Sequence, residues 1–402
     1  MTGLFVDPNE RALREAAALG RLEGEGAGGG GEGGGDGGGG GGGRRDGDGS
    51  RTDAADAAAL RRGLEPARLE LLERADWVRY SLAGNLADFA CPSADGRVLA
   101  GRALRYHGNQ PLCYGRHPCE HVAFVGCHDN ETVFDQVATR LPLRASADDR
   151  ARACRLAASL SLLSIGVPFL HAGDDLLRSK SLDRDSYDSG DWFNAVDWTG
   201  ALGNGFGRGL PPAAKNAGAW PAKRRLLRDA ARVAPTPAMR RRAASYVRAL
   251  LRARYSSPLF RMADAAHVCA QLRFLNTGPE QMPGAIVMVL SSAPVPTGGA
   301  GGGEGGGTHD GRYASVVCVF NARPEPYEFS FPGDNEQGGG GGEQGGGGKG
   351  GSGALALHPA LEDLRGLQGD DRDEAVEGCY AEGRRLVVAA RTAAVFVEEW
   401  AR

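Results

Sequence analysis

An apolar segment that ends in three consecutive polar side chains constrains the fold of this chain more than any other feature. Residues 122–125 are Val-Ala-Phe-Val, and His128, Asp129 and Asn130 follow a glycine and a cysteine. In an α/β barrel the strand interiors are apolar and the chemistry lies where each strand ends. The pattern therefore predicts a buried parallel strand that opens into a functional site. An ordinary strand-to-loop turn explains the same three residues, so this run alone leaves both interpretations open.

A second apolar run further along the chain ends in the same way and favours the functional interpretation. It is followed by His171, by two acids and by a loop, residues 178–194, that is dense in Asp, Arg, Tyr, Trp and Asn. Planar donors and acceptors suit sugar hydroxyls, and aromatic faces suit the C–H side of a sugar ring. A solvated loop rarely places aromatic side chains such as Tyr187 and Trp192 among so many charges. The loop is therefore predicted to bind carbohydrate.

Both runs closely resemble segments of starch-debranching enzymes of the pullulanase and limit-dextrinase type, in the α-amylase clan of glycoside hydrolases. Residues 128–135 resemble the segment of that family at barrel strand seven. Residues 171–194 resemble the segment after strand eight, with Asp175 in place of Glu and Asp188 in place of Asn. The resemblance covers nearly the whole chain apart from its glycine tracts, and it implies the C-terminal portion of such an enzyme. Further similar segments are residues 1–9, 83–86, 209–212, 254–261 and 274–279.

The order of predicted elements agrees with this resemblance. Strands are expected at residues 121–127 and 167–170, with a helix between them that starts at a capping-box-like sequence in residues 146–149. After Pro258, short valine-rich runs between turn residues predict an antiparallel β domain. We therefore expect an α/β plus all-β fold, with about the last two strand–helix units of a (β/α)8 barrel followed by an antiparallel β-sandwich. Further helices are predicted at residues 52–79 and 236–255.

Glycine-rich tracts interrupt the chain, which contains 64 glycines among its 402 residues. Such low-complexity sequence cannot bury a core, and it lacks the strand–turn–helix context of a nucleotide-binding loop. We interpret the tracts as insertions in surface loops. The expected domains are a partial barrel at 1–257, with a glycine-rich insertion at 24–50, and a β-sandwich at 258–402. Its glycine-rich loops are residues 298–307 and 338–353.

Charge and hydropathy exclude several classes of function. The formal net charge is −3 with both signs spread along the chain, so no nucleic-acid partner is expected. No apolar stretch reaches the length of about 18 residues that suggests a membrane span. The N-terminus lacks the basic start and apolar core of a leader, so no transit peptide is predicted. The resemblance implies the plastid stroma, and the sequence otherwise fits a soluble intracellular protein.

Metal and cofactor chemistry is not predicted from the sequence. The eight cysteines are scattered, and free thiols are expected. Cys113 and Cys119 flank His117, but no second pair lies at zinc-ligand spacing. No metal site and no required cofactor are expected, although members of the family often carry calcium.

The resemblance assigns one catalytic acid to this chain. Retaining glycoside hydrolysis uses two carboxylates about 5–5.5 Å apart across the scissile bond. The α-amylase clan adds a third acid that stabilises the oxocarbenium-like sugar, and the resemblance implies that Asp129 is this acid and that His128 binds the same ring. Trp192 is expected either to stack on a sugar or to support the loop from the core. The residues that the resemblance places around neighbouring glucose units are Asn130, Arg184, Asp185, Tyr187 and Asp191.

The other two catalytic acids of the family have no match here. They lie in Phe-Arg-Phe-Asp-like and Gly-Glu-Gly-Trp-like segments, and neither segment occurs in the chain. Asp7 ends an apolar run, but the resemblance places it after the acid-bearing segment. Glu25 lies in a glycine tract with no strand before it. Asp174 and Asp175 are better explained as the rim of strand eight, paired with Arg178.

Two functional hypotheses follow. The first is hydrolysis of α-1,6-glucosidic bonds by a retaining mechanism, with branched α-glucan (amylopectin, limit dextrin or pullulan) as the partner. This chain would supply Asp129 but lack the nucleophile and general acid, so it is expected to be inactive alone. The second is a catalytically inactive truncated homologue that binds a glucan or a partner protein. An incomplete barrel would also expose strand edges, which predicts poor solubility.

Overall fold

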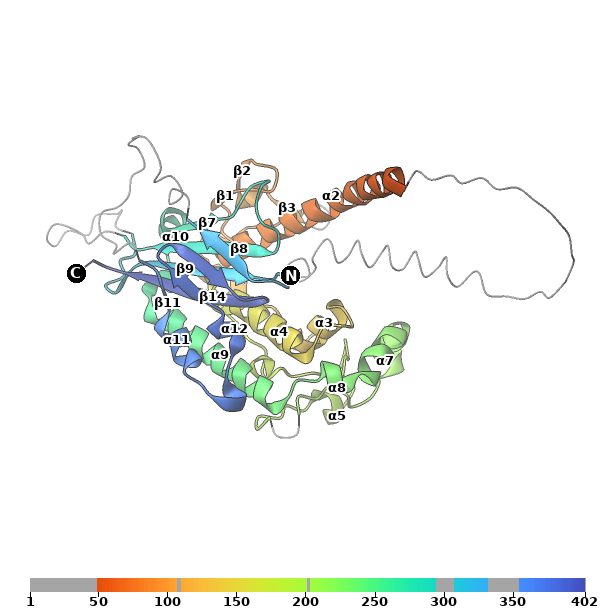
Figure 1. Ribbon diagram of the computed structural model, residues 1–402. Helices are drawn as coiled ribbons and strands as arrows, with labels where there is room; N and C mark the ends of the chain where they lie inside the picture. The colour runs from red at the N-terminus through yellow and green to blue at the C-terminus, as the bar shows by residue number, and fades with distance from the viewer. Residues whose placement is uncertain (1–48, 107–109, 201–202, 294–306, 332–353, 402) are drawn as a thin grey trace, which may run out of the picture.

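A computed structural model of the chain describes residues 49–106, 110–200, 203–293, 307–331 and 354–401 (Figure 1). Within the first helix, side chains are described from Pro66 onward. Asp7, Glu25 and nearly all of the three predicted glycine-rich segments lie outside the described residues. The predicted insertion at 24–50 overlaps the first helix by two residues, because that helix begins at Gly49.

The described chain opens with a long helix, α2 (Gly49–Leu82), which confirms the helix predicted at residues 52–79. Its last turn is anchored in the core, where Tyr80 and Leu82 are buried. Two small antiparallel hairpins follow it. Their strands are β1 (Ala90–Pro92), β2 (Val98–Ala100), β3 (Arg105–Tyr106) and β4 (Gln110–Pro111).

A strand–helix–strand unit occupies the middle of the chain, as predicted. Strands β5 (Val122–Ala123) and β6 (Val167–Pro168) pair in parallel, with Val122 opposite Val167. The connection holds helices α3 (Val133–Arg140) and α4 (Ala147–Leu162), and Ser146 and Asp149 form the predicted capping box at the start of α4. Both strands are shorter than the predicted 121–127 and 167–170. The described residues hold this single parallel pair of strands, so a closed barrel around it stays a prediction.

The C-terminal third is antiparallel β structure, as predicted. It follows α9 (Pro237–Ser256), whose side-chain cap Thr236 and leading Pro237 agree with the predicted helix start. A five-stranded sheet has the order β11 (Ala356–Leu357), β14 (Thr392–Glu399), β9 (Tyr313–Asn321), β8 (Ala285–Ser291) and β7 (Leu272–Leu275). A three-stranded sheet has the order β10 (Tyr327–Ser330), β13 (Arg385–Val388) and β12 (Tyr380–Glu382). The arrangement of these two sheets as a sandwich stays a prediction.

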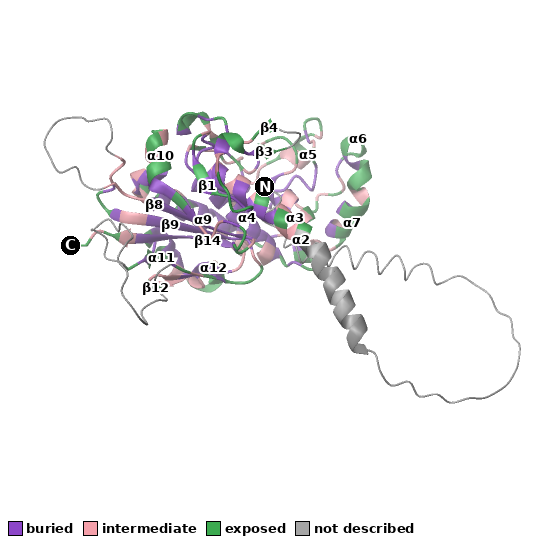
Figure 2. Cartoon of the chain, turned by 90° about the horizontal axis from the view of Figure 1, so that it is seen from above, coloured by how far each residue is buried: buried purple, intermediate pink, exposed green. Residues whose placement is uncertain are grey.

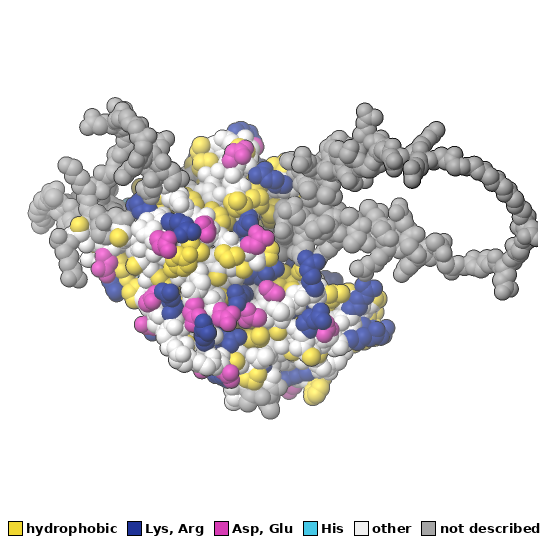
Figure 3. All heavy atoms as spheres, in the orientation of Figure 1, with side chains coloured by type: hydrophobic (Ala, Val, Ile, Leu, Met, Phe, Trp, Pro, Cys, Tyr) yellow, Lys and Arg dark blue, Asp and Glu magenta, His cyan; other side chains and the backbone are white. Residues whose placement is uncertain are grey.

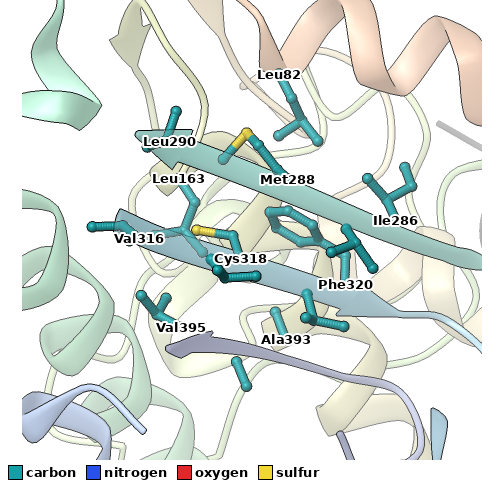
Figure 4. Close-up of a cluster of buried hydrophobic side chains, with 14 of the residues drawn as sticks. Leu82, Leu163, Ile286, Met288, Leu290, Val316, Cys318, Phe320, Ala393 and Val395 are labelled. Carbon is teal, nitrogen blue, oxygen red and sulfur yellow. The ribbon is translucent and has the colours of Figure 1, made fainter. Parts of the chain in front are cut away.

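One hydrophobic core joins the helices to the five-stranded sheet. In Figure 4, Leu82 from the end of α2 and Leu163 from the end of α4 lie beside side chains of β8, β9 and β14. Figure 1 places α4 and α9 below this sheet, and Figure 2 shows its strands as largely buried. The hydroxyl of Tyr246 on α9 donates to the carbonyl of Ala393 on β14. The buried core is therefore continuous across residue 257, and the domain boundary predicted there stays a prediction.

Shorter helices cover the rest of the described chain. On the face drawn in Figure 3, acidic and basic side chains are interspersed. None of the described helices combines the length and the apolarity that crossing a bilayer requires. The remaining α-helices are α5 (Asp191–Asn194), α6 (Ala213–Asn216), α7 (Trp220–Arg228), α8 (Ala230–Val233), α10 (Ala265–Gln271), α11 (Pro359–Arg365) and α12 (Glu374–Glu377).

Candidate functional site

The parallel pairing of β5 and β6 brings the two predicted functional loops to the same edge. Both strands run in one direction, so the residues after each strand emerge side by side. Just beyond the paired residues, the rings of Phe124 and Phe169 meet edge to face with centroids 6.1 Å apart. The ammonium group of Lys180, from the second loop, donates to the carbonyl of His128 in the first at 3.2 Å. The two runs singled out in the sequence therefore form one continuous surface.

The predicted catalytic acid projects from the first loop into solvent. The side chains of His128 and Asp129 are 85% and 73% exposed, and the imidazole Nε2 lies 3.5 Å from the nearer carboxylate oxygen. Asn130 follows with a left-handed backbone at φ 59°, a conformation that Asn tolerates better than most residues. This turn directs an imidazole, a carboxylate and a carboxamide outward within one short segment. Such a set can donate to and accept from sugar hydroxyls.

A buried carboxylate on α3 holds the second loop in place. Asp135 has no solvent exposure, and it accepts hydrogen bonds from the hydroxyl of Ser179 and from the backbone amide of Lys180 at 2.8 Å. Burial raises the pKa of Asp135 to about 6, although these hydrogen bonds act in the opposite direction. The helix that follows the first loop is thus bonded directly to the second loop.

Lys180, in the second loop, makes a further bond between the two loops. Its side chain is nearly inaccessible to solvent, and burial lowers its pKa. The ammonium group reaches back to the carbonyl of His128, so it fixes the backbone from which Asp129 projects. Neither Asp135 nor Lys180 was predicted to have a role, although both lie inside the two segments that resemble the family.

A second buried carboxylate supports the part of the loop that was predicted to bind sugars. Asp183 accepts from the amide of Asn216 at 3.0 Å and from the hydroxyl of Ser189 at 2.6 Å. Lys223 on α7 donates in turn to the side-chain oxygen of Asn216. Helices α6 and α7 therefore brace the loop from beneath. Asn216 and Lys223 were not predicted to belong to the site, because both are distant from the loop along the chain.

The residues predicted to line glucose sites are on the outside of this braced loop. Arg184 and Asp191 are exposed, and Tyr187 is 96% exposed. Asp185 is half-buried and pairs with Lys215 at 2.7 Å, and the hydrogen bond from this lysine lowers the pKa of the carboxyl. These side chains are accessible to a large ligand.

The position of Trp192 contradicts one of the two roles expected for it, support of the loop from the core. The residue is 64% exposed, so it is not an aromatic residue that supports the loop from the core. The indole N–H donates to the carbonyl of Arg208 at 2.9 Å, and the guanidinium of Arg208 lies 5.7 Å from the ring centroid. A ring held at one edge by a hydrogen bond is restrained in orientation, as a stacking platform must be. Arg208 was not identified from the sequence.

The acids that follow β6, Asp174 and Asp175, do not form the ion pair with Arg178 that the sequence predicted. Asp174 is buried, and burial raises its pKa to about 7, with only partial compensation from a hydrogen bond with the backbone of His171 and from the charge of Arg178. The described residues contain no ion pair within 4.0 Å between Arg178 and either Asp174 or Asp175. The guanidinium bonds instead to His171 Nε2 at 3.2 Å and to the carbonyl of Asn194, and it thereby connects the end of the strand to α5.

Within the described part of the chain, no group of three or more His, Cys, Asp or Glu side chains is arranged to hold a metal ion.

Comparisons with known proteins agree on one kind of relative. The sequence family described as alpha-1,6-glucosidases, pullulanase-type, C-terminal matches residues 201–399. Pullulanase 1, chloroplastic, of Arabidopsis thaliana is 41% identical over 261 residues, which are 63% of this chain and 25% of that protein. The pullulanase of Klebsiella pneumoniae is 34% identical over 251 residues, 62% of this chain and 22% of that protein. The matched part therefore spans a quarter or less of the length of these relatives.

Solved structures show the same similarity in three dimensions. PulA from Klebsiella oxytoca superposes with a TM-score of 0.69 and 28% identity, covering 83% of this chain and 28% of that one. A Klebsiella pneumoniae pullulanase complexed with maltotriose superposes with a TM-score of 0.66 and 29% identity, covering 82% and 28%.

Proposed function

Because the chain belongs to the family of pullulanase-type α-1,6-glucosidases, whose C-terminal portion it matches, we propose that it supplies one side of the glucan-binding cleft of a starch-debranching hydrolase. The observation that carries this proposal is the surface formed where β5 and β6 end. There, Asp135 and Lys180 join the two loops from beneath and leave the carboxylate of Asp129 free in solvent. A branched α-glucan such as amylopectin, limit dextrin or pullulan is the proposed partner.

The proposed roles of the exposed residues follow from their chemistry. Asp129 stabilises the positive charge that develops on the sugar ring during retaining hydrolysis, and His128 and Asn130 bind the same ring. Trp192 stacks on a glucose unit. The remaining contacts to neighbouring glucose units are assigned to Arg184, Asp185, Tyr187 and Asp191. The maltotriose complex of the Klebsiella pneumoniae pullulanase supports an α-glucan as the ligand class.

We propose that this chain alone does not cleave α-1,6 bonds, because it carries one candidate acid where the mechanism requires a nucleophile and a general acid as well. Pullulan incubated with the purified 402-residue chain should release no new reducing ends. Hydrolysis that disappears in Asp129→Asn would overturn this statement. The name of the Arabidopsis relative supports the plastid as the location.

The second candidate function is a glucan-binding module without activity, which the exposed loop of Tyr187 and Trp192 favours. Maltotriose binding to the full chain, measured by titration calorimetry, tests the surface that both functions need. Trp192→Ala should weaken binding about tenfold, which corresponds to about 1.4 kcal/mol. The matched control is Trp198→Ala, because Trp198 is exposed to the same extent and lies outside the predicted site. Equal affinity in the two variants would refute the assignment of Trp192.

A further inference from the structure

A segment in which every second residue is glycine, residues 203–209, lies against the loop that carries Trp192. All four of its glycines have a left-handed backbone, with φ between 86° and 119°. Residues other than glycine seldom adopt such φ values, so glycine at these positions permits one repeated backbone shape. The three side chains between the glycines, those of Asn204, Phe206 and Arg208, each contact a different part of the site.

Asn204 and Phe206 attach this segment to the site. The side-chain amide of Asn204 donates to the carbonyl of Leu177 at 2.7 Å. The backbone carbonyl of Asn204 accepts from the amide of Ser179 at 2.6 Å. The ring of Phe206 meets the ring of Phe134 on α3 edge to face, with centroids 5.8 Å apart. The segment is therefore bonded to the start of the second loop and packed on the helix that follows the first.

The contact between this segment and the second loop is close, and it holds a strained backbone. A Cβ atom on Gly205 would overlap the carbonyl oxygen of Ser179, so a larger residue does not permit this approach. Leu177 and Ser181 have left-handed φ values of 56° and 52°, which such residues keep only where the surrounding structure imposes them. The segment bonds to both, because the hydroxyl of Ser181 donates to the carbonyl of Gly209 at 2.7 Å. It therefore supports the conformation of the loop.

Arg208 connects this support to the aromatic ring of the predicted sugar site. The indole N–H of Trp192 donates to the carbonyl of Arg208 at 2.9 Å, and the guanidinium of Arg208 donates to the carbonyl of Trp192 at 2.6 Å. The guanidinium also lies 5.7 Å from the ring centroid, within the range of a cation–π interaction. Arg208 thus holds both the backbone and the ring of Trp192, although this residue is 64% exposed.

We propose that Arg208 is a positioning residue that holds the ring of Trp192 in the orientation that stacks on a glucose unit. The proposal rests on the proposed function, because it gives Arg208 a role in the same glucan-binding surface. A ring that is already ordered before binding loses less conformational freedom when the sugar docks. Arg208 acts through Trp192, and it needs no contact with the sugar.

Fluorine NMR of the full chain labelled with 5-fluorotryptophan tests the positioning without any sugar. The signal of Trp192 is identified by its absence from Trp192→Phe. Arg208→Met should lower the transverse relaxation rate of this signal about twofold, because the ring moves more freely. Arg208→Lys, which keeps a charged donor, should restore most of the natural rate.

The matched control is Arg224→Met, because the guanidinium of Arg224 lies 5.5 Å from the ring centroid of a different tryptophan, Trp220. This substitution should leave the relaxation rate of the Trp192 signal unchanged. A rate that is the same in the natural chain and in Arg208→Met would overturn the proposal.

Titration with maltotriose tests whether the ordered ring matters for binding. Arg208→Met should weaken binding about fivefold in the natural chain and should have no effect in a chain that already carries Trp192→Ala. An equal loss in both backgrounds would overturn the proposal, because Arg208 would then act independently of Trp192. A natural chain that binds no maltotriose would refute the proposed function and with it the stacking role, while the relaxation rates would still show whether Arg208 holds the ring.

Discussion

Asp135 is a carboxylate with no access to solvent, and it accepts hydrogen bonds from the loop that carries the predicted sugar-binding residues. Lys180 in that loop bonds back to the carbonyl of His128. Neither side chain is placed to touch a sugar at the surface. Their effect is indirect, because each fixes backbone from which an exposed residue projects. The geometry of the site therefore depends on two buried residues as much as on Asp129.

The raised pKa of Asp135 predicts how its contribution to stability changes with pH. Burial raises this pKa from 3.8 to about 6, so the folded state favours the protonated form. The contribution is fully present below pH 3.8 and is lost as the pH rises through about 6. It amounts to at most about 3 kcal/mol, at about 1.4 kcal/mol per pKa unit.

Asp135→Asn isolates this contribution, because asparagine does not titrate. The free energy of unfolding of the natural chain, minus that of Asp135→Asn, should decrease as the pH rises from about 4 to about 6. It should then stay constant at higher pH. Urea unfolding over this pH range measures the difference. A difference that grows with pH would mean that hydrogen bonds to the carboxylate outweigh its burial.

At the scale of elements, one side chain of α9 donates three hydrogen bonds to the segment that joins α4 to β6. Arg254 is buried and donates to the carbonyls of Leu162, Ser164 and Gly166, at 3.0, 2.6 and 2.8 Å. The last carbonyls of a helix have no partner within the helix, so they need donors of this kind. The arginine thereby ends α4 and positions the strand that leads to the second loop.

Arg254→Met should lower the free energy of unfolding by about 2–4 kcal/mol, because it leaves buried carbonyls without donors. Arg248→Met is the matched control on the same helix, since Arg248 is exposed. Its effect should stay within about 0.5 kcal/mol. Equal effects of the two substitutions in urea unfolding would show that the three bonds do not stabilise the join.

Local signals predicted the elements well, and distant partners account for what was missed. The capping box at Ser146 and the Thr236–Pro237 start of α9 were predicted because both depend on residues within one turn. Strand length was overestimated, because apolar residues continue beyond the paired positions. The exposed position of Trp192 and the role of Asp135 depend on partners in other segments of the chain, which hydrophobic periodicity does not reveal.

At the scale of the whole molecule, a buried ion pair joins the strand–helix–strand unit to the C-terminal part of the chain. Arg155 on α4 bonds to Asp373, which caps α12, and its guanidinium also lies 5.1 Å from the ring centroid of Tyr246 on α9. Burial alone would raise the pKa of Asp373, but attraction and hydrogen bonding from Arg155 lower it. The two parts of the chain are therefore expected to unfold together.

Asp373→Asn should cost about 3–5 kcal/mol at neutral pH, because it leaves a buried guanidinium without its counter-charge. The contribution of Asp373 is present above its unfolded pKa of 3.8 and should be lost as the pH falls through its lower folded pKa. Thermal unfolding of the natural chain and of Asp373→Asn measures this loss of stability. The matched control is Glu382→Gln, which removes an exposed carboxylate that pairs with Arg385 on the surface. A second, separate transition in the natural chain would contradict joint unfolding.

The proposed glucan surface spans both loops, so the most direct test is to map where maltotriose binds on the full chain. Hydrogen exchange with and without saturating maltotriose should show slower exchange in residues 128–132 and in residues 184–194 together. Trp192→Ala should reduce the protection in both segments at the same sugar concentration. Protection in one segment alone, or in neither, would contradict the claim that the ends of β5 and β6 form a single binding surface.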